Sequence, residues 1–265
     1  MAGGTAAGAR STTTEGSSKP ARRGIQVIAR AANILRTLEA ENHGLSLSQI
    51  AERVGLARPT VQHIVAELQQ QDLVMPAGPH SGFQLGPGLV RLGAAAQPGF
   101  VEIVRPLLET LFLRIDETID LSILRGTRVY FIDQIIAQHR LRAVSAIGAA
   151  FPLISTANGK AMLAAMENET AEKIFHDTDP AEIGPGKTWD DLLREMTEIR
   201  RVGVAYDREE HSEGICALGV DIGRPNGIPA AISIPVPAHR FRRRADELTR
   251  EILSARERIL EALGS

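Results

Sequence analysis

Hydrophobic residues recur at steps of three and four positions along the first part of the chain, which is the spacing of an amphipathic helix. The first stripe predicts a helix that begins near residue 25 and ends near 42–44, and its members are Ile28, Ala31, Ala32, Leu35 and Leu38. Ser46 precedes a second, short helical run, with Gln49 three positions later as in a capping box. Gly55 is expected to end that run.

A third helix is expected to begin at residues 57–60, because a proline suits the first helical turn, where its missing N–H would have no partner anyway. Its predicted buried stripe consists of Val61, Ile64, Val65 and Leu68. A strand at 73–74, a turn at 78–82, a returning strand at 83–85 and a short helix at 87–95 follow. The order of these elements predicts a winged helix-turn-helix.

The rest of the chain mixes helical and strand patterns. Helices are expected at 101–116, 160–166, 170–175, 190–202 and 238–263, and strands at 119–124, 129–134, 141–146, 204–206, 217–222 and 230–234. This order favours helices packed around one sheet, so we expect an α+β protein. Its expected parts are a flexible arm at 1–24, a winged domain at 25–86, a linker helix at 87–98 and a second domain at 99–265.

Composition narrows the class of protein. The chain has 265 residues, of which 43% are hydrophobic and 23% charged, as in an ordinary globular protein. No uncharged apolar run approaches the roughly 20 residues that cross a bilayer, and residues 1–20 lack the apolar centre of a secretion signal. We therefore expect a cytoplasmic protein with no membrane partner. Cys216 is the one cysteine, which excludes an internal disulfide and a Cys-rich zinc or iron-sulfur site.

Charge is distributed unevenly between the two halves. Nine basic and six acidic residues lie up to Leu92, which leaves 21 basic and 26 acidic residues from the totals of 30 and 32. This imbalance hints that the front part meets a polyanion.

The third helix carries side chains suited to reading DNA. In a winged helix-turn-helix this helix enters the major groove, where arginine can pair with guanine and glutamine with adenine. The predicted DNA contacts are Arg30, Ser46, Arg58, Thr60, Gln62 and His63. Small winged folds also serve as protein-docking or dimerisation modules. The pattern therefore leaves open a small-molecule-binding protein in which the winged domain has that role.

Several blocks of sequence resemble the IclR family of bacterial transcriptional regulators over about 240 residues. These blocks include 46–51, 55–61, 82–86, the Gly-Lys-Ala block within 157–164, the Asp-x-Glu-Glu block within 203–210, and 230–233. The resemblance implies a homodimer or homotetramer, a linker helix, and a GAF-like α/β domain that binds a small organic-acid or aromatic effector. Because a twofold protein matches a twofold site, the expected DNA partner is a near-palindromic, double-stranded operator. A repressor is one possibility, and the sequence leaves repression or activation open.

The segment from Ser155 to Gly159 offers hydroxyls and free backbone N–H groups at a helix start, which is a natural site for an anion. Its predicted effector contacts are Ser155, Thr156, Ala157, Asn158 and Gly159. Ser155 and Thr156 could equally be helix caps. Lys160 is expected to point to solvent or to pair with an acid.

The resemblance places further effector contacts at Asp207 and Ser233 and apolar lining at Ile147 and Leu153. The chain departs from the family pattern at two points. In an ungapped alignment Cys216 occupies a position where arginine is common, with Ala217 in place of the family's cysteine, and Pro235 occupies a position where serine is common. Cys216 is counted among the predicted effector contacts. The loss of polar groups predicts an effector that is less polar, larger or more aromatic than a two- or three-carbon acid.

Enzymatic and metal-binding alternatives have weaker support. Cys216 and His211 are close in sequence, but a lone cysteine in an apolar stretch is more often a core residue than a nucleophile. His211 and the acids around it lack the spacing of a defined metal site, and a solvated acidic loop is the simpler interpretation. No phosphate-binding glycine motif occurs. We therefore expect no catalytic residue, no metal and no cofactor.

Overall fold

The computed structural model describes residues 26–41, 43–78, 82–96, 99–183 and 186–264. The chain divides into two compact units that meet between Ala96 and Gln97. The proposed arm at 1–24 lies outside the described residues. Within them, no helix combines the length and apolarity that crossing a bilayer requires.

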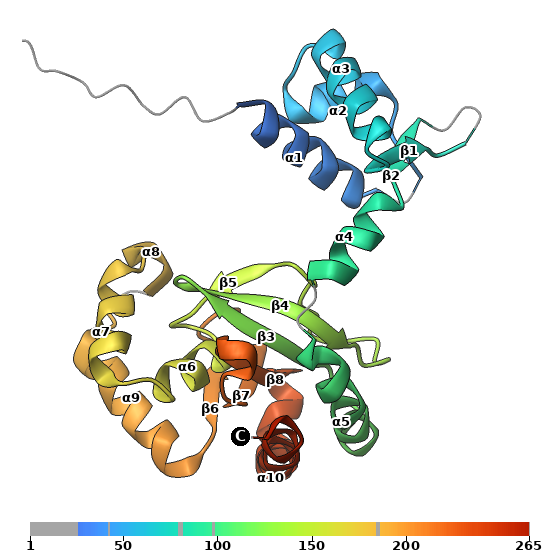
Figure 1. The fold of residues 1–265 in the computed structure, drawn as a ribbon. Helices are drawn as coiled ribbons and strands as arrows, with labels where there is room; N and C mark the ends of the chain where they lie inside the picture. The colour runs from blue at the N-terminus through green and yellow to red at the C-terminus, as the bar shows by residue number, and fades with distance from the viewer. Residues whose placement is uncertain (1–25, 42, 79–81, 97–98, 184–185, 265) are drawn as a thin grey trace, which may run out of the picture. The chain divides into compact units, whose positions relative to one another are not determined.

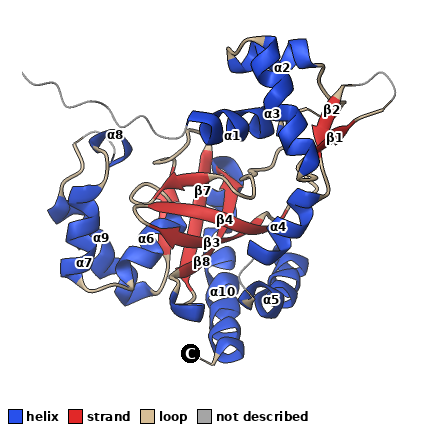
Figure 2. Ribbon diagram, turned by 45° about the horizontal axis from the view of Figure 1, so that its top comes forward, coloured by secondary structure: helices blue, strands red, loops and turns tan. Residues whose placement is uncertain are grey.

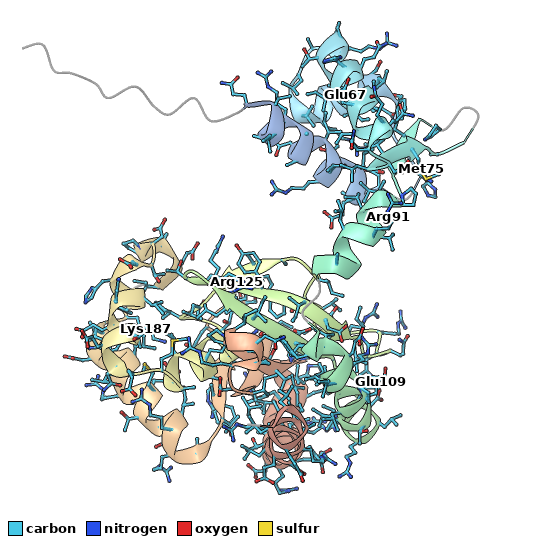
Figure 3. All side chains as sticks on the ribbon, viewed as in Figure 1. Glu67, Met75, Arg91, Glu109, Arg125 and Lys187 are labelled. Carbon is cyan, nitrogen blue, oxygen red and sulfur yellow. The ribbon has the colours of Figure 1, made fainter. Side chains whose placement is uncertain are left out.

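The first unit is a helix-turn-helix with a two-stranded wing (Figure 1). Its elements are α1 (Gln26–Glu39), α2 (Leu47–Val54), α3 (Arg58–Gln70), β1 (Val74–Pro76), β2 (Phe83–Leu85) and α4 (Gly88–Ala96). The predicted stripe of α3 is buried as expected, together with Ile34, Leu38 and Ile50 from the other two helices. Arg91 projects from α4 (Figure 3), and its Nη2 lies 3.3 Å from Asp72 Oδ2.

The predicted capping signals of the first unit are present. Ser46 and Gln49 form a reciprocal capping box at the start of α2, and Gly55 ends α2 in the left-handed conformation, with φ +66°. Pro59 lies in the first turn of α3. These local signals place the turn between α2 and α3 and so fix where α3 begins.

The second unit is built around one antiparallel sheet. Its helices are α5 (Phe100–Ile115), α6 (Ala157–Ala164), α7 (Asn168–Asp177), α8 (Pro180–Ile183), α9 (Trp189–Val202), η1 (Pro225–Gly227, a 3-10 turn) and α10 (Ala238–Leu263). Its strands are β3 (Ile119–Arg125), β4 (Arg128–Ile135), β5 (Ala150–Pro152), β6 (Ala205–Arg208), β7 (Ile215–Asp221) and β8 (Ala230–Pro237). The strand order is β5-β4-β3-β8-β7-β6. The chain thus has the predicted α+β class, a winged helix-turn-helix followed by a GAF-like α/β domain.

Two hydrophobic cores cover different parts of this sheet. Helices α5 and α10 lie side by side (Figure 2) and bury residues at three- and four-residue steps, such as Val104 with Leu108 and Leu248 with Ile252. Helices α6, α7 and α9 form a separate group (Figure 2) around Met162, which is fully buried.

The predicted strand at 141–146 is wrong. That segment forms no strand, and the fifth strand of the chain is β5, at 150–152. Ala143 and Ser145 are buried while their neighbours are exposed, so the alternation that suggested a strand is real. Side-chain hydrogen bonds, rather than backbone pairing with a neighbouring strand, hold this segment. Ser145 Oγ donates to Asp120 Oδ2, and Arg240 Nη1 donates to the carbonyl of Leu141.

Candidate functional site

Helix α3 exposes the side chains predicted to read DNA. Arg58, Gln62 and His63 are exposed, and Thr60 is half-buried. Arg58 and Gln62 lie four residues apart and therefore share one face of the helix. No hydrogen bond or ion pair of the described residues engages either side chain, so both have their donors available.

His63 lies on a different side of α3. Together with Glu67 it lines a shallow groove of about 240 Å³ whose opposite wall is Val27 and Ile28 of α1. His63 is therefore less suitably placed than Arg58 or Gln62 to act with them on the same bases.

The other two predicted DNA contacts already serve local structure. The Oγ of Ser46 accepts from the backbone N of Gln49 at 3.3 Å as the cap of α2. Arg30 lies on α1, where its Nη2 donates to Gln26 Oε1 at 3.2 Å. Both side chains can still reach a phosphate, and their role in DNA binding stays a prediction.

The second unit contains a cavity of about 290 Å³ on the face of the sheet that carries α6. It is lined by residues of all six strands, β3 to β8, by the start of α6, and by the segments 142–145 and 211–212. Its lining residues are Asp120, Phe131, Arg142, Ala143, Val144, Ser145, Phe151, Thr156, Ala157, Asn158, Asp207, His211, Ser212, Ile215, Ala217, Ser233 and Pro235.

One wall of this cavity is aromatic. The rings of Phe131 and Phe151 meet edge to face with centroids 4.8 Å apart, and the ring of His211 lies 4.5 Å from that of Phe151. Burial lowers the pKa of His211, which favours its neutral form near pH 7. A flat apolar ligand would find contact surface on these three rings.

Asp207 presents a free oxygen to the cavity. Its Oδ1 accepts from the backbone N of Glu210 at 2.8 Å and of His211 at 3.4 Å, whereas no described residue donates to Oδ2. The side chain is 5% exposed, and burial raises its pKa to about 6, although the two backbone N–H groups act in the opposite direction. Ser233 is similar, because it is 4% exposed and no described residue hydrogen-bonds its Oγ. Both groups can bond to a ligand without breaking an existing contact.

Five of the ten predicted effector contacts line this cavity: Thr156, Ala157, Asn158, Asp207 and Ser233. Thr156 does not cap α6 with its side chain. Its Oγ1 donates to the carbonyl of Pro152 at 2.8 Å. The backbone N–H groups of Ala157 and Asn158, the first two of α6, have no described partner and belong to residues that line the cavity, whereas that of Gly159 donates to Asn158 Oδ1 at 3.1 Å.

The other five predicted contacts lie elsewhere. Ile147 is 59% exposed, Leu153 is fully buried in the core under α6, and Ser155 is half-buried without lining the cavity. Gly159 packs on the backbone of Leu153, where an added Cβ would lie 2.0 Å from the Leu153 carbonyl oxygen. Its role is to let α6 approach that backbone closely.

Cys216 lies on the opposite face of the sheet, in the core beneath α5 and α10. Successive side chains of a strand alternate between faces, so its neighbour Ala217 lines the cavity instead. The prediction for Cys216 is therefore wrong by one residue. Ala217 is the residue at the cavity, and it lacks the thiol that the family's cysteine has at this position. Burial raises the pKa of the Cys216 thiol, which is the reverse of what a nucleophile requires.

Lys160 pairs with acids and does not reach solvent. It is completely buried on α6, and its Nζ donates to Glu195 Oε1 and, at 2.6 Å, to Glu210 Oε1. Lys187 donates to both of the same carboxylates. Since Glu210 also gives its backbone N–H to Asp207, this network anchors the turn that holds Asp207.

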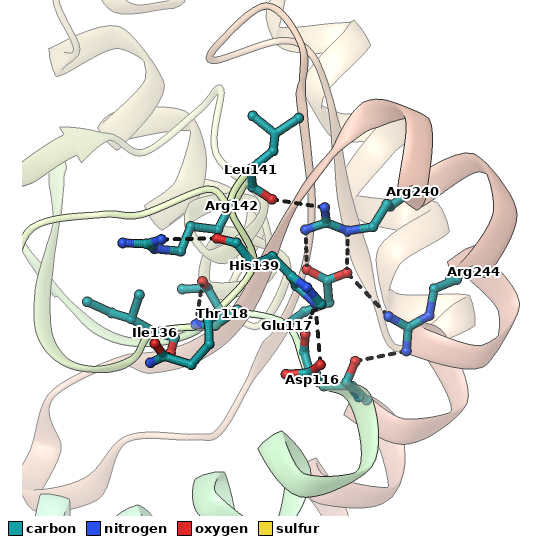
Figure 4. A network of polar contacts seen from close by, with 12 residues as sticks. Asp116, Glu117, Thr118, Ile136, His139, Leu141, Arg142, Arg240 and Arg244 are labelled. Carbon is teal, nitrogen blue, oxygen red and sulfur yellow. Dashed lines mark hydrogen bonds and ion pairs between the residues drawn. The ribbon is translucent and has the colours of Figure 1, made fainter.

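The segment that forms the outer wall of the cavity is tied to α10. Glu117 is 1% exposed and accepts from Arg240 Nε and Nη2, both at 2.8 Å, and from Arg244 Nη1 at 3.2 Å (Figure 4). Arg240 also donates to the carbonyl of Leu141, and Thr118 Oγ1 accepts from the backbone N of Ala137 at 3.2 Å. These bonds hold the chain just before the wall, and the bond from Ser145 Oγ to Asp120 Oδ2 holds the wall at its other end.

Sequence reasoning missed Asp120, the two phenylalanines and the wall at 142–145. One signal was available, because Asp120 and Ser122 are polar residues between Ile119, Leu121 and Ile123, which places both on one face of a strand. Phe131 and Phe151 carried no such signal. Among the described residues no cluster of His, Cys, Asp or Glu could hold a metal ion.

Two family models match the chain, one on each unit. The IclR helix-turn-helix domain matches residues 27–76, and the C-terminal domain of the bacterial transcriptional regulator IclR matches residues 94–260. The HTH-type transcriptional regulator Rv1719 of Mycobacterium tuberculosis is 44% identical over 236 residues, 87% of this chain and 90% of that protein. The HTH-type transcriptional regulator TtgV of Pseudomonas putida is 37% identical over 241 residues, 91% of this chain and 93% of that protein. These are similarities to regulators, which favours a regulator over the docking-module alternative.

Solved structures share the fold. The IclR protein of Thermotoga maritima superposes with a TM-score of 0.77 at 25% identity, covering 91% of this chain and all of that one. An IclR homologue of Microbacterium hydrocarbonoxydans, solved in complex with 4-hydroxybenzoate, has a TM-score of 0.71 at 20% identity, covering 89% of this chain and 98% of that one. At that identity the second likeness concerns the fold alone.

Proposed function

Since the chain belongs to the IclR family of bacterial transcriptional regulators, we propose that α3 reads a near-palindromic operator and that the cavity of the second unit senses an aromatic effector. The cavity carries the proposal, because it combines aromatic walls with two buried polar residues, Asp207 and Ser233, that each keep an oxygen without a described hydrogen-bond donor. A protein that acts on chromosomal DNA works in the bacterial cytoplasm, and repression relieved by the effector is the simplest mode.

On the DNA side, Arg58 and Gln62 are the base-reading residues, because they are exposed, unpaired and on one face of α3. Arg30 and Ser46 contact phosphates, together with Thr60 at the start of α3. His63 contributes less, since it faces the groove beside α1. A twofold site on DNA calls for a twofold protein, so the working form is a homodimer or a homotetramer.

On the effector side, Asp207, Ser233 and the first N–H groups of α6 hold an oxygen of the effector. The ring lies against Phe131, Phe151 and His211. Ala217 and Pro235 line the cavity where the family pattern leads one to expect cysteine and serine, so a small, strongly polar acid would find fewer partners here. A phenol matches this site, because its hydroxyl can donate to Asp207 and accept from Ser233 or a backbone N–H.

Gel shifts on the DNA upstream of the chain's own gene test the DNA-binding half. Arg58→Ala should weaken operator binding about tenfold or more, the loss expected of one bidentate base contact. Arg201→Ala is the matched control, because it removes the same charge from an exposed position of the second unit. Equal operator binding by Arg58→Ala and wild type would remove Arg58 from the interface.

Calorimetry with 4-propylphenol, glyoxylate and pyruvate tests the effector half. We expect the phenol alone to bind, to lose affinity in Asp207→Asn, and to alter operator binding by wild-type protein. A coupling of roughly 1 to 3 kcal/mol between the two sites is sufficient for such control. Tight binding of glyoxylate or pyruvate would overturn the proposed effector class.

A further inference from the structure

Asp120 is a buried acid that the proposed function does not use. It lies on β3, is 1% exposed and borders the cavity. Its oxygens accept from Gln134 Nε2 at 2.5 Å and from Ser145 Oγ at 2.8 Å, and no ion pair of the described residues includes it. A carboxylate buried without a cation is costly, so its retention beside a cavity requires an explanation.

Asp120 and Asp207 lie at opposite ends of the cavity. Asp120 faces Ser233 of β8 in the sheet register, whereas Asp207 faces Ala217 of β7, and the strand order is β3-β8-β7-β6. Three steps between strands, each of about 4.8 Å, separate the two backbones by roughly 14 Å. One elongated molecule can therefore meet both acids, one at each end.

The two ends differ in their electrostatics. The cation of Lys160 acts on the carboxylate of Asp207 and favours its charged form. No cation acts on Asp120 in this way, and burial raises its pKa to about 6 against the effect of its two hydrogen bonds. Arg142 also borders the cavity, but it is exposed and donates to the carbonyl of His139 at 3.0 Å. A positively charged group is therefore better placed beside Asp120 than beside Asp207.

We propose that Asp120 is a specificity-determining residue that receives the hydrogen-bond-donating end, a hydroxyl or a protonated amine, of an elongated aromatic effector. The other end of the effector is held by Asp207, two strands beyond the Ser233 that faces Asp120. This inference therefore rests on the proposed function of the cavity. Carboxylate oxygens can each accept more than one hydrogen bond, so the bonds from Gln134 and Ser145 leave room for a further donor.

A purely structural role for Asp120 would lie in its bond to Ser145, which ties down the wall of the cavity. Thr118→Val offers a control for that role. It removes a second tether of the same segment, the bond from the backbone N of Ala137, without changing a charge at the cavity. If Asp120 merely holds the wall, the two variants should behave alike.

Calorimetry on the full-length protein at pH 7.5 tests the proposal with 4-propylphenol, tyrosol and tyramine. These phenols are matched in shape and carry a methyl, a hydroxyl and an ammonium group at the far end. Wild-type protein should bind tyramine at least about tenfold more tightly than 4-propylphenol, the expected worth of a charge-assisted hydrogen bond, with tyrosol between them. Asp120→Asn should reduce that ratio to about one, whereas Thr118→Val should keep it.

A tyramine ratio near one in wild-type protein, or an unchanged ratio in Asp120→Asn, would overturn the role of Asp120 while leaving the aromatic effector class in place. A reduced ratio in Thr118→Val equal to that in Asp120→Asn would assign Asp120 to wall-holding and overturn it as well. Failure of all three phenols to bind counts against the proposed effector class itself, which separates the two failures.

Discussion

The two faces of the six-stranded sheet are made by the same strands but hold opposite kinds of side chain. Beneath α5 and α10 the strands contribute mainly buried apolar side chains, such as Leu121, Ile232 and Leu218, and the thiol of Cys216. The polar groups on this face have partners on the helices: Asp133 pairs with Arg105 of α5, and the Tyr206 hydroxyl meets Thr249 of α10. This face is a closed core, and its residues are interchangeable with others of similar volume.

The opposite face buries polar groups beside the cavity. Ser122 Oγ accepts from Asn158 Nδ2 at 2.9 Å and donates to the carbonyl of Ala231 at 3.2 Å, so this pair is satisfied within the protein. Ser233 lies one strand from Ser122 and Asp207 three strands from it, and each keeps an oxygen without a described partner. Both residues line the cavity, so these oxygens are open to it. The difference accords with our proposal that one face supplies stability and the other supplies recognition.

The largest expected effect is on the apolar face. Leu108→Ala on α5 should lower the free energy of unfolding by about 4 kcal/mol, because the side chain is fully buried and its removal leaves a cavity. Urea titration followed by circular dichroism measures the loss. At temperatures where the variant is folded, its affinity for 4-propylphenol should equal that of wild type. Weakened ligand binding in the folded variant would show that the faces are not separable.

A smaller loss is expected from the buried cation on the cavity side. Lys160→Met should cost about 2 kcal/mol, below the full penalty for breaking a buried ion pair, because Lys187 still pairs with both acids. Unlike Leu108→Ala, it should also weaken phenol binding, since the turn that carries Asp207 loses its anchor. Lys160→Arg should restore part of both properties. If Lys160→Met bound the phenol as tightly as wild type, Lys160 would contribute to stability alone and not to the position of Asp207.

The same contrast explains what the sequence could predict. The helix at 238–263 has both ends where its pattern placed them, because one stripe packs on a dry core. The segment 141–146 has the alternation of a strand but is a cavity wall. A pattern that repeats every two residues shows only that burial alternates, and it does not show that the backbone pairs with another strand. Cys216 and Ala217 show a similar limit at the site. Neighbouring residues of a strand face opposite sides of the sheet, so an error of one position in assigning a contact moves it to the wrong face. The burial of Lys160 could not be predicted from the pattern of its own helix, because its acidic partners, Glu195 and Glu210, are distant in sequence.

The next prediction concerns the pH dependence of stability that Asp120 causes on the cavity face of the sheet. The pKa of Asp120 is about 6 in the folded protein against an ordinary value of 3.8, so its unfavourable effect on stability is absent below about pH 4, grows between about pH 4 and 6, and is constant above that range. Asp120→Asn should therefore raise the free energy of unfolding by about 1 to 2 kcal/mol at pH 7.5 and not at pH 4. Asp207 and Asp221 titrate in the same range in both proteins and cancel in the difference. An equal gain at both pH values would mean that ionisation is not the cause.

The smallest expected effect on stability comes from Ser233, and it sharpens the comparison most. Ser233→Ala should change the free energy of unfolding by less than about 0.5 kcal/mol, because its Oγ has no described partner to lose. Ser122→Ala, on the adjoining strand and the same face, should cost about 1 to 3 kcal/mol, because it leaves the Asn158 amide without its acceptor. Phenol affinity should show the reverse order, with a several-fold loss in Ser233→Ala. A stability loss in Ser233→Ala as large as that in Ser122→Ala would mean that Ser233 belongs to the polar core and that the cavity lacks one of its two free groups.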